Sequence, residues 1–129
     1  MPRRKFGNKI TYIGKLKFDS KREAEWYLIY KDMERRGEIS NLRLQVPYEL
    51  VPGVYQEVEV VKHLKTKDKI IKKKVTIDNP VRYIADFVYL DNKSGKEVVI
   101  DVKGRRTKEY IIKRKLMRYL RGIEVIEVK

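Results

Sequence analysis

The chain has 129 residues, and its 32 Lys and Arg against 18 Asp and Glu give a formal net charge of +14 at pH 7. This length fits one domain of ordinary size and is too short for a multi-domain enzyme. The lack of cysteine excludes a disulfide scaffold, a cysteine zinc site and thiol catalysis. The single histidine, His63, excludes a poly-histidine metal site within one chain. The positive charge predicts a polyanionic partner, most simply nucleic acid.

The first 15 residues are basic and contain two glycines, so we predict an irregular arm there. Arg3, Arg4 and Lys5 in this arm are candidate DNA contacts. No apolar segment follows these basic residues, and no apolar stretch in the chain approaches the roughly 20 residues that span a bilayer. Neither a membrane span nor a secretory signal is therefore expected, and we predict a cytoplasmic protein.

A helix is predicted to begin after Phe18, where Asp19 or Ser20 can cap it and Glu23 follows Ser20 at the capping-box spacing. Gly37 is predicted to end this helix. Residues 41–51 then alternate between apolar and polar side chains, which indicates a strand.

Residues 54–77 form a candidate β-hairpin that is inserted in the single domain, with a turn near residues 65–69. This hairpin is the most basic part of the chain, and Lys72 and Lys73 within it are candidate DNA contacts. The sequence does not decide whether the hairpin belongs to a dimer interface or clasps an arm of DNA.

Two further strands are predicted over residues 82–90 and 97–103, joined by a short hairpin connection. A second helix over residues 107–121, capped by Thr107, leads to a last strand over residues 123–128. Because this helix links two strands as a crossover, the two strands should be parallel. The helix has an apolar stripe made of Ile111, Ile112, Leu116, Tyr119 and Leu120.

Two aspartates, Asp86 and Asp101, lie inside apolar strands. Strand interiors disfavour Asp, and a buried carboxylate is costly unless a partner compensates its charge. A symmetric connection centred between Lys93 and Ser94 places the two aspartates directly opposite one another, with Cβ atoms roughly 5 Å apart. Two carboxylates at this distance repel unless a proton or a cation lies between them. Coordination by oxygen atoms alone suits Mg²⁺, with Mn²⁺ able to substitute.

Three further residues complete this candidate site. Lys103 lies two residues beyond Asp101 and therefore projects from the same face of the strand, where its ammonium can orient water and stabilise charge on a scissile phosphate. The backbone carbonyl of Val102 is a candidate metal ligand. Glu23 can supply a third carboxylate if its helix packs against this end of the sheet. For Glu23, simple helix capping is the open alternative, and Glu25 competes with it as the helix carboxylate.

Other polar residues have simpler interpretations. Gln45 can reach the site, but a polar residue satisfied in the core or at a sheet edge is the simpler reading. His63 lies in the basic hairpin and is interpreted as a solvated surface residue. The nine tyrosines can stack on bases, although their strand and helix spacing favours packing.

At these residues the sequence resembles the PD-(D/E)xK nuclease superfamily, over about residues 18–128. The expected order of helix, three strands, helix and strand also matches the αβββαβ core of that superfamily. One departure is Ala85, which stands where the superfamily signature has proline. The matching motif elements are Glu23, Asp86 in Ile84-Ala-Asp-Phe87, and Asp101-Val-Lys103.

The resemblance implies an α/β protein with a restriction-endonuclease-like core, in which helices flank a central mixed sheet. It also implies a Mg²⁺-dependent endonuclease that cleaves DNA phosphodiester bonds. Glu23, Asp86, Asp101 and Lys103 are the implied catalytic residues, and Glu23, Asp86, Asp101 and Val102 the implied metal ligands.

The wording of these motifs is closest to small phage-type nucleases, and the compact basic form resembles archaeal-type Holliday junction resolvases. This closer likeness implies a phage-encoded homodimer that cuts branched DNA in recombination and repair. Flaps, forks or phage DNA ends are alternative substrates, and a non-catalytic DNA-binding module on the same fold is an alternative of another class. The expected DNA contacts are Arg3, Arg4, Lys5, Lys72, Lys73, Arg105, Arg106 and Lys113.

Overall fold

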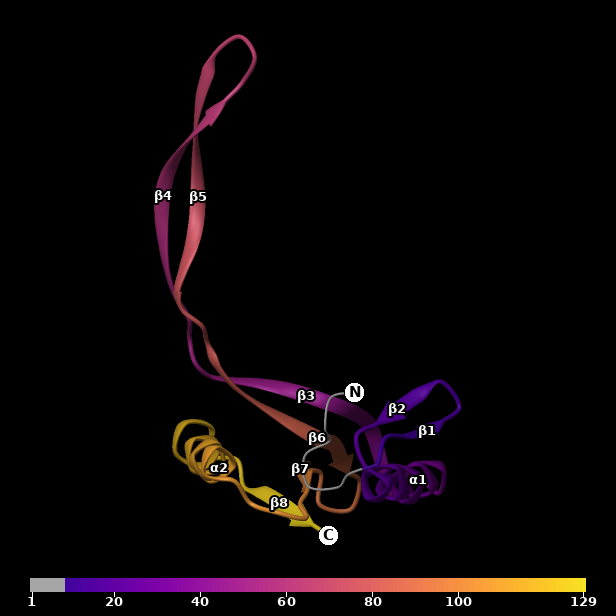
Figure 1. Cartoon of the computed structure of the whole chain (residues 1–129). Helices are drawn as coiled ribbons and strands as arrows, with labels where there is room; N and C mark the ends of the chain where they lie inside the picture. The colour runs from indigo at the N-terminus through magenta and orange to yellow at the C-terminus, as the bar shows by residue number, and fades with distance from the viewer. Residues whose placement is uncertain (1–8) are drawn as a thin grey trace. The chain divides into compact units, whose positions relative to one another are not determined.

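The computed structural model describes residues 9–129, which fall into two compact units (Figure 1). The first unit, called the core unit, holds the described residues up to Tyr48 together with Tyr83–Lys129. The second unit, called the ribbon, is Glu49–Arg82. Each unit is described by itself below.

The core unit begins with a short hairpin, in which β1 (Thr11–Ile13) pairs antiparallel with β2 (Leu16–Phe18). The expectation of an irregular arm over residues 1–15 is therefore wrong from Thr11 onward. Strands of three residues are too short to produce a recognisable alternation, and Gly14, with φ of 59°, makes the turn between them. The expected contacts Arg3, Arg4 and Lys5 lie outside the described residues.

Helix α1 (Lys21–Arg35) follows, and its start confirms the predicted capping. The Ser20 Oγ atom accepts a hydrogen bond of 3.1 Å from the backbone N–H of Glu23, which satisfies one of the free donors of the first turn. Gly37, with φ of 78°, follows the helix in the left-handed conformation that glycine adopts readily.

A mixed sheet of four strands forms the centre of the core unit, in the order β3-β6-β7-β8. Its strands are β3 (Ile39–Val51), β6 (Val81–Asp91), β7 (Glu97–Val102) and β8 (Val125–Val128). Strands β6 and β7 are antiparallel, whereas β7 and β8 are parallel. This arrangement confirms the α/β class and the predicted parallel crossover.

The register between β6 and β7 is the one that the symmetric connection predicts. Phe87 lies opposite Ile100 and Val88 opposite Val99. The next pair in this register would be Asp86 with Asp101, but the backbone pairing ends at Phe87 and Ile100.

Helix α2 (Lys108–Arg121) makes the crossover from β7 to β8, with Thr107 as its cap. Its predicted apolar stripe is largely exposed, because Ile112, Tyr119 and Leu120 keep 58%, 86% and 47% of their surface accessible. The helix instead buries Tyr110 and Met117. Among residues 9–129, neither helix has the length and apolar character that crossing a bilayer requires.

The core lies on both faces of β6. The Tyr30 ring of α1 lies 5.3 Å from the ring of Phe87 and 5.1 Å from that of Tyr89, measured between centroids. Val88 between them is fully buried and, by the alternation of a strand, faces the other side of the sheet. Burial on both sides makes this part of the sheet rigid enough to hold polar side chains at its end.

The ribbon is an antiparallel pair, β4 (Val54–His63) with β5 (Asp68–Asp78). Nearly all of its side chains are exposed.

Candidate functional site

Asp86 and Asp101 both lie just beyond the point where the pairing of β6 and β7 ends. Asp86 on β6 accepts a hydrogen bond of 2.8 Å at Oδ2 from the backbone N–H of Val102 on β7. A side-chain carboxylate therefore joins the two strands beyond the last recorded backbone pair, Phe87 and Ile100. In an extended strand the N–H and C=O of one residue point to the same side, so the Val102 carbonyl lies on the edge of β7 that faces Asp86.

Glu23 of α1 joins this site through Gln45 of β3. The Gln45 amide donates a hydrogen bond of 3.0 Å to Glu23 Oε1 and one of 3.2 Å to Asp86 Oδ1. Gln45 holds a left-handed backbone with φ of 50°, which is uncommon for a residue with a side chain. Gln45 therefore does reach Glu23 and Asp86, and the same two hydrogen bonds satisfy its amide on the strand. Its polar side chain inside a strand was the available signal.

Burial and its carboxylate neighbour perturb the pKa of Glu23. The side chain is buried, with 6% of the residue exposed. Burial, a hydrogen bond to Asp86 and the charge of Asp86 together raise the pKa of Glu23 to about 8. The proton that this raised pKa favours lessens the repulsion between Glu23 and Asp86. The sequence prediction of a proton or a cation concerned a different pair, Asp86 and Asp101.

Asp101 is the most buried acid of the site, with 3% of the residue exposed. Its Oδ2 accepts a hydrogen bond of 2.6 Å from the Tyr83 hydroxyl. Its Oδ1 lies 3.1 Å from the Lys103 ammonium, close enough for an ion pair but outside hydrogen-bonding geometry. Burial and the charge of Asp86 raise the pKa of Asp101, while Tyr83 and Lys103 oppose the rise.

Lys103 is held on its other side by an aromatic ring. Its ammonium lies 4.0 Å from the ring centroid of Tyr110, a cation–π contact. The Tyr110 hydroxyl donates a hydrogen bond of 2.9 Å to the Glu127 carboxylate. The same carboxylate accepts hydrogen bonds of 3.1 Å from Arg114 and of 2.8 Å from Arg106. Burial would raise the pKa of Glu127, but the hydrogen bonds from Arg106 and Tyr110 outweigh it and lower that pKa. Tyr110 and Glu127 thus position the lysine, and the sequence analysis did not single them out.

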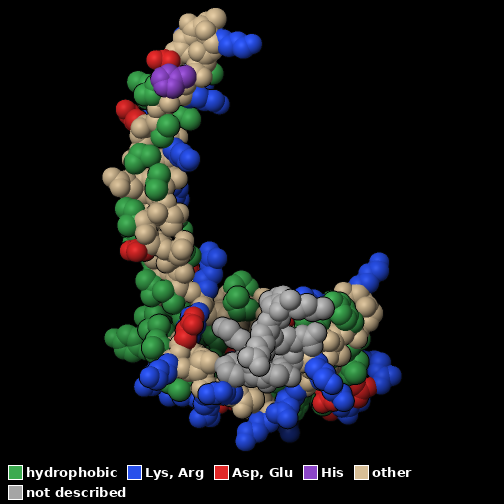
Figure 2. All heavy atoms as spheres, in the orientation of Figure 1, with side chains coloured by type: hydrophobic (Ala, Val, Ile, Leu, Met, Phe, Trp, Pro, Cys, Tyr) green, Lys and Arg blue, Asp and Glu red, His purple; other side chains and the backbone are tan. Residues whose placement is uncertain are grey.

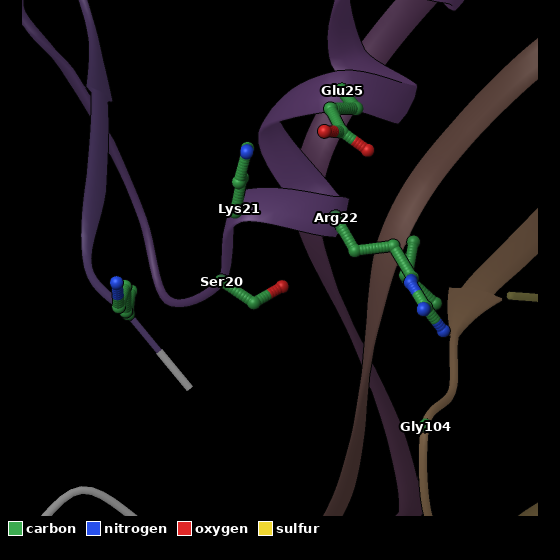
Figure 3. A pocket seen from close by; sticks show the side chains of 7 residues that line it. Ser20, Lys21, Arg22, Glu25 and Gly104 are labelled. Carbon is green, nitrogen blue, oxygen red and sulfur yellow. The ribbon is translucent and has the colours of Figure 1, made fainter. Parts of the chain in front are cut away.

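A cavity of about 580 Å³ opens beside this site, between the start of α1 and the end of β7 (Figure 3). Figure 3 shows Arg22 pointing from α1 toward the segment that carries Gly104. Val102, the neighbour of Asp101 and Lys103, also lines the cavity. The basic side chains of Lys21 and Arg22 thus line a cavity to which Val102 also belongs. The lining residues are Lys9, Ser20, Lys21, Arg22, Glu25, Val102 and Gly104.

The donor set suits a hard divalent cation. Every candidate ligand offers oxygen: the carboxylates of Glu23, Asp86 and Asp101 and the carbonyl of Val102. Asp101 Oδ1 is the one buried side-chain N or O atom in the described part of the chain that has no hydrogen-bond partner. As arranged, no three His, Cys, Asp or Glu side chains among residues 9–129 form a complete metal site. These oxygen donors are of the type that Mg²⁺ prefers, but the described residues do not bring three of the acids together at one point.

A family model described as "Protein of unknown function (DUF1064)" matches residues 3–126. The chain belongs to the DUF1064 family. The comparisons with curated proteins and with solved structures gave no match. The region shared with DUF1064 includes every residue of the site except Glu127, and it includes the ribbon.

Within this DUF1064 chain, most of the expected DNA contacts of the described region have partners inside the protein. Arg106 pairs with Glu127, and Lys113 lies 2.9 Å from Glu109. Arg105 also makes an interaction within the protein. In the ribbon, Lys72 lies 3.8 Å from Glu57, whereas no ion pair is recorded for Lys73.

The remaining sequence candidates separate clearly. Glu25 is exposed and lines the cavity, whereas the buried Glu23 is joined to Asp86 through the Gln45 amide. His63 pairs with Asp68 at 2.8 Å on the surface of the ribbon. Its side chain is 80% exposed, as expected for a solvated surface residue.

Proposed function

We propose that this protein is a Mg²⁺-dependent DNA endonuclease of the PD-(D/E)xK type, with the four-way Holliday junction as its favoured substrate. The observation that carries the proposal is a chain of contacts. Gln45 joins Glu23 to Asp86, Asp86 accepts from the Val102 N–H, and the neighbouring Asp101 lies 3.1 Å from the Lys103 ammonium. Three carboxylates in and around a protein interior are costly, and burial with perturbed pKa values is typical of functional sites. The order of elements in the core unit supports a restriction-endonuclease-like core.

The chemistry follows from the residues that surround Asp101. Glu23, Asp86, Asp101 and the Val102 carbonyl would hold Mg²⁺, which supplies Lewis-acid polarisation of the phosphate and an acidified water. Lys103, held between Asp101 and the Tyr110 ring, orients the attacking water and offers positive charge to the phosphate oxygens.

The cavity beside the site contributes substrate binding. Lys21 and Arg22 line it together with Val102, so a phosphate bound there lies next to the proposed ligands. Lysine and arginine contacts to phosphates fix the position of a duplex without reading its bases. Recognition by charge and shape in this way suits a branched DNA better than a defined base sequence.

A homodimer completes the proposal. Two symmetric cuts in a four-way junction call for two active sites related by a twofold axis. The exposed apolar side chains Ile112, Tyr119 and Leu120 on α2 support a self-complementary interface at this helix.

The test is a cleavage panel with a four-way junction, flap, fork, linear duplex and single strand, all at one salt concentration, in Mg²⁺ and in EDTA. We expect Mg²⁺-dependent cutting of the junction, and loss of cutting in Asp101→Asn with junction binding retained. Asp32→Asn on the surface of α1 is the matched control and should cut like the parent protein. Persistent cutting by Asp101→Asn would contradict the proposed site. Equal cutting of the linear duplex would remove the junction preference and leave the nuclease.

A further inference from the structure

One face of the ribbon carries lysines without any acid. Directly paired residues of an antiparallel ladder share a face, and successive pairs alternate between the two faces. The pairs Gln56–Val75, Val58–Lys73, Val60–Ile71 and Lys62–Lys69 therefore lie on one side. We call this side the lysine face; its charged residues are Lys62, Lys69 and Lys73.

The opposite face, called the paired face, has its charges balanced. There Glu57 lies opposite Lys74, and Glu59 opposite Lys72. Lys72 reaches Glu57 at 3.8 Å. His63 and Asp68 also lie on this face. In Figure 2 the blue and the red side chains emerge along different edges of the ribbon.

The lysine face is electrostatically incomplete. Lys62 lies directly opposite Lys69, and like charges in this relation destabilise a ladder. No ion pair is recorded for Lys62, Lys69 or Lys73 within residues 9–129. An anionic ligand on this face would therefore relieve repulsion, whereas on the paired face it would compete with Glu57 and Glu59.

We propose that the lysine face binds the phosphate backbone of duplex DNA. The choice of DNA as the ligand rests on the proposed nuclease function. Lys69 and Lys73 are four residues apart, so their Cα atoms are about 13 Å apart along the strand. A two-stranded ribbon fits the major groove, which is about 12 Å wide, and lysines on such a ribbon can reach its phosphates.

The paired residues of the lysine face include no Phe, Trp or Tyr, which favours duplex over single-stranded DNA as the ligand. Proteins that bind single strands stack bases on aromatic side chains. The one aromatic side chain within the paired strands is Tyr55, which lies on the paired face with the Lys74 ammonium 4.1 Å from its ring centroid. The lysine face thus offers charge without a stacking platform.

The test compares two double variants of the full chain with the same charge change. Lys69→Gln/Lys73→Gln alters the lysine face, and Lys72→Gln/Lys74→Gln alters the paired face. Binding of a linear duplex is measured against salt concentration by fluorescence anisotropy, and thermal melts check folding. Because each phosphate contact contributes about 0.9 to the salt slope, we expect the first variant to lower the slope by about 2 and the affinity by roughly tenfold per lysine at low salt. The second variant should lower both by clearly less.

Equal losses in the two variants would overturn the proposal, as would no loss in either. A stronger effect of the lysine-face variant on a matched single strand, or on vesicles of anionic phospholipid, would overturn it in favour of that ligand. Junction cleavage in Mg²⁺ is measured in parallel with enzyme in saturating excess. Duplex binding through the lysine face without any cleavage would support this inference and contradict the nuclease. Junction cleavage together with a salt slope that the lysine-face variant leaves unchanged would support the nuclease and contradict this inference.

Discussion

The core unit and the ribbon treat charge in opposite ways. In the core unit the acids of the candidate site are buried or half-buried, and hydrogen bonds from Gln45, Tyr83 and the Val102 N–H compensate Asp86 and Asp101. In the ribbon the lysines are exposed to water, which screens them, and the lysine face has no acid to pair with them. A buried charge in the core unit therefore carries a desolvation cost and requires particular partners. An exposed charge in the ribbon carries little such cost and can contact a ligand.

The largest expected difference between the two units is in the free energy of unfolding lost when an apolar side chain is truncated. Phe87 is fully buried between α1 and the sheet. We expect Phe87→Ala to lower the free energy of unfolding by about 3–5 kcal/mol, because it removes buried apolar surface and leaves a cavity. Urea denaturation followed by circular dichroism measures this change. A loss similar to that of an exposed residue would contradict the core as described.

The next effect concerns the partner of Asp101. Tyr83→Phe removes the hydroxyl that donates to Asp101 Oδ2 and leaves a buried carboxylate oxygen unsatisfied. We expect a loss of about 1–3 kcal/mol in the free energy of unfolding. Tyr30→Phe, at another buried tyrosine, is the control and should cost less. An equal cost at both positions would show that the Tyr83 hydroxyl contributes nothing special.

The pH dependence of stability tests the pairing of Glu23 with Asp86. With a pKa of about 8 instead of 4.5, folded Glu23 keeps a proton that the unfolded chain has lost. Its contribution to stability is therefore present at acid pH and decreases as pH rises from about 5 to 8. Glu23→Gln should remove this decrease in metal-free buffer, as measured by denaturation at several pH values. Glu38→Gln, at an exposed glutamate, should retain it.

The smallest effect is expected in the ribbon. Ile70 is 65% exposed, so Ile70→Ala should change the free energy of unfolding by less than about 0.5 kcal/mol. The same denaturation series that measures Phe87→Ala measures this variant. A loss near that of Phe87→Ala would mean that Ile70 is covered in solution, and the contrast between the two units would fail.

Local chemistry made much of the fold predictable. Ser20 and Thr107 are caps because their hydroxyls satisfy backbone donors within three residues. The register of β6 and β7 follows from the short connection between them, which sets Val88 opposite Val99 and Phe87 opposite Ile100. The β1–β2 hairpin was not predicted because its strands have three residues each. The exposure of the apolar stripe of α2 was not predicted because the spacing of apolar residues does not show what packs on them.

The sequence by itself determined the two aspartates in apolar strands, the lysine two residues beyond the second, the caps of both helices and the excess of positive charge. Only the tertiary structure decided that Gln45 joins Glu23 to Asp86, that Tyr83 and Tyr110 hold Asp101 and Lys103, and that Lys72 and Lys73 lie on different faces. Capping and strand alternation depend on residues that are neighbours in the chain, so the sequence predicts them. The contacts of the site join residues up to 41 positions apart, and only packing brings such residues together.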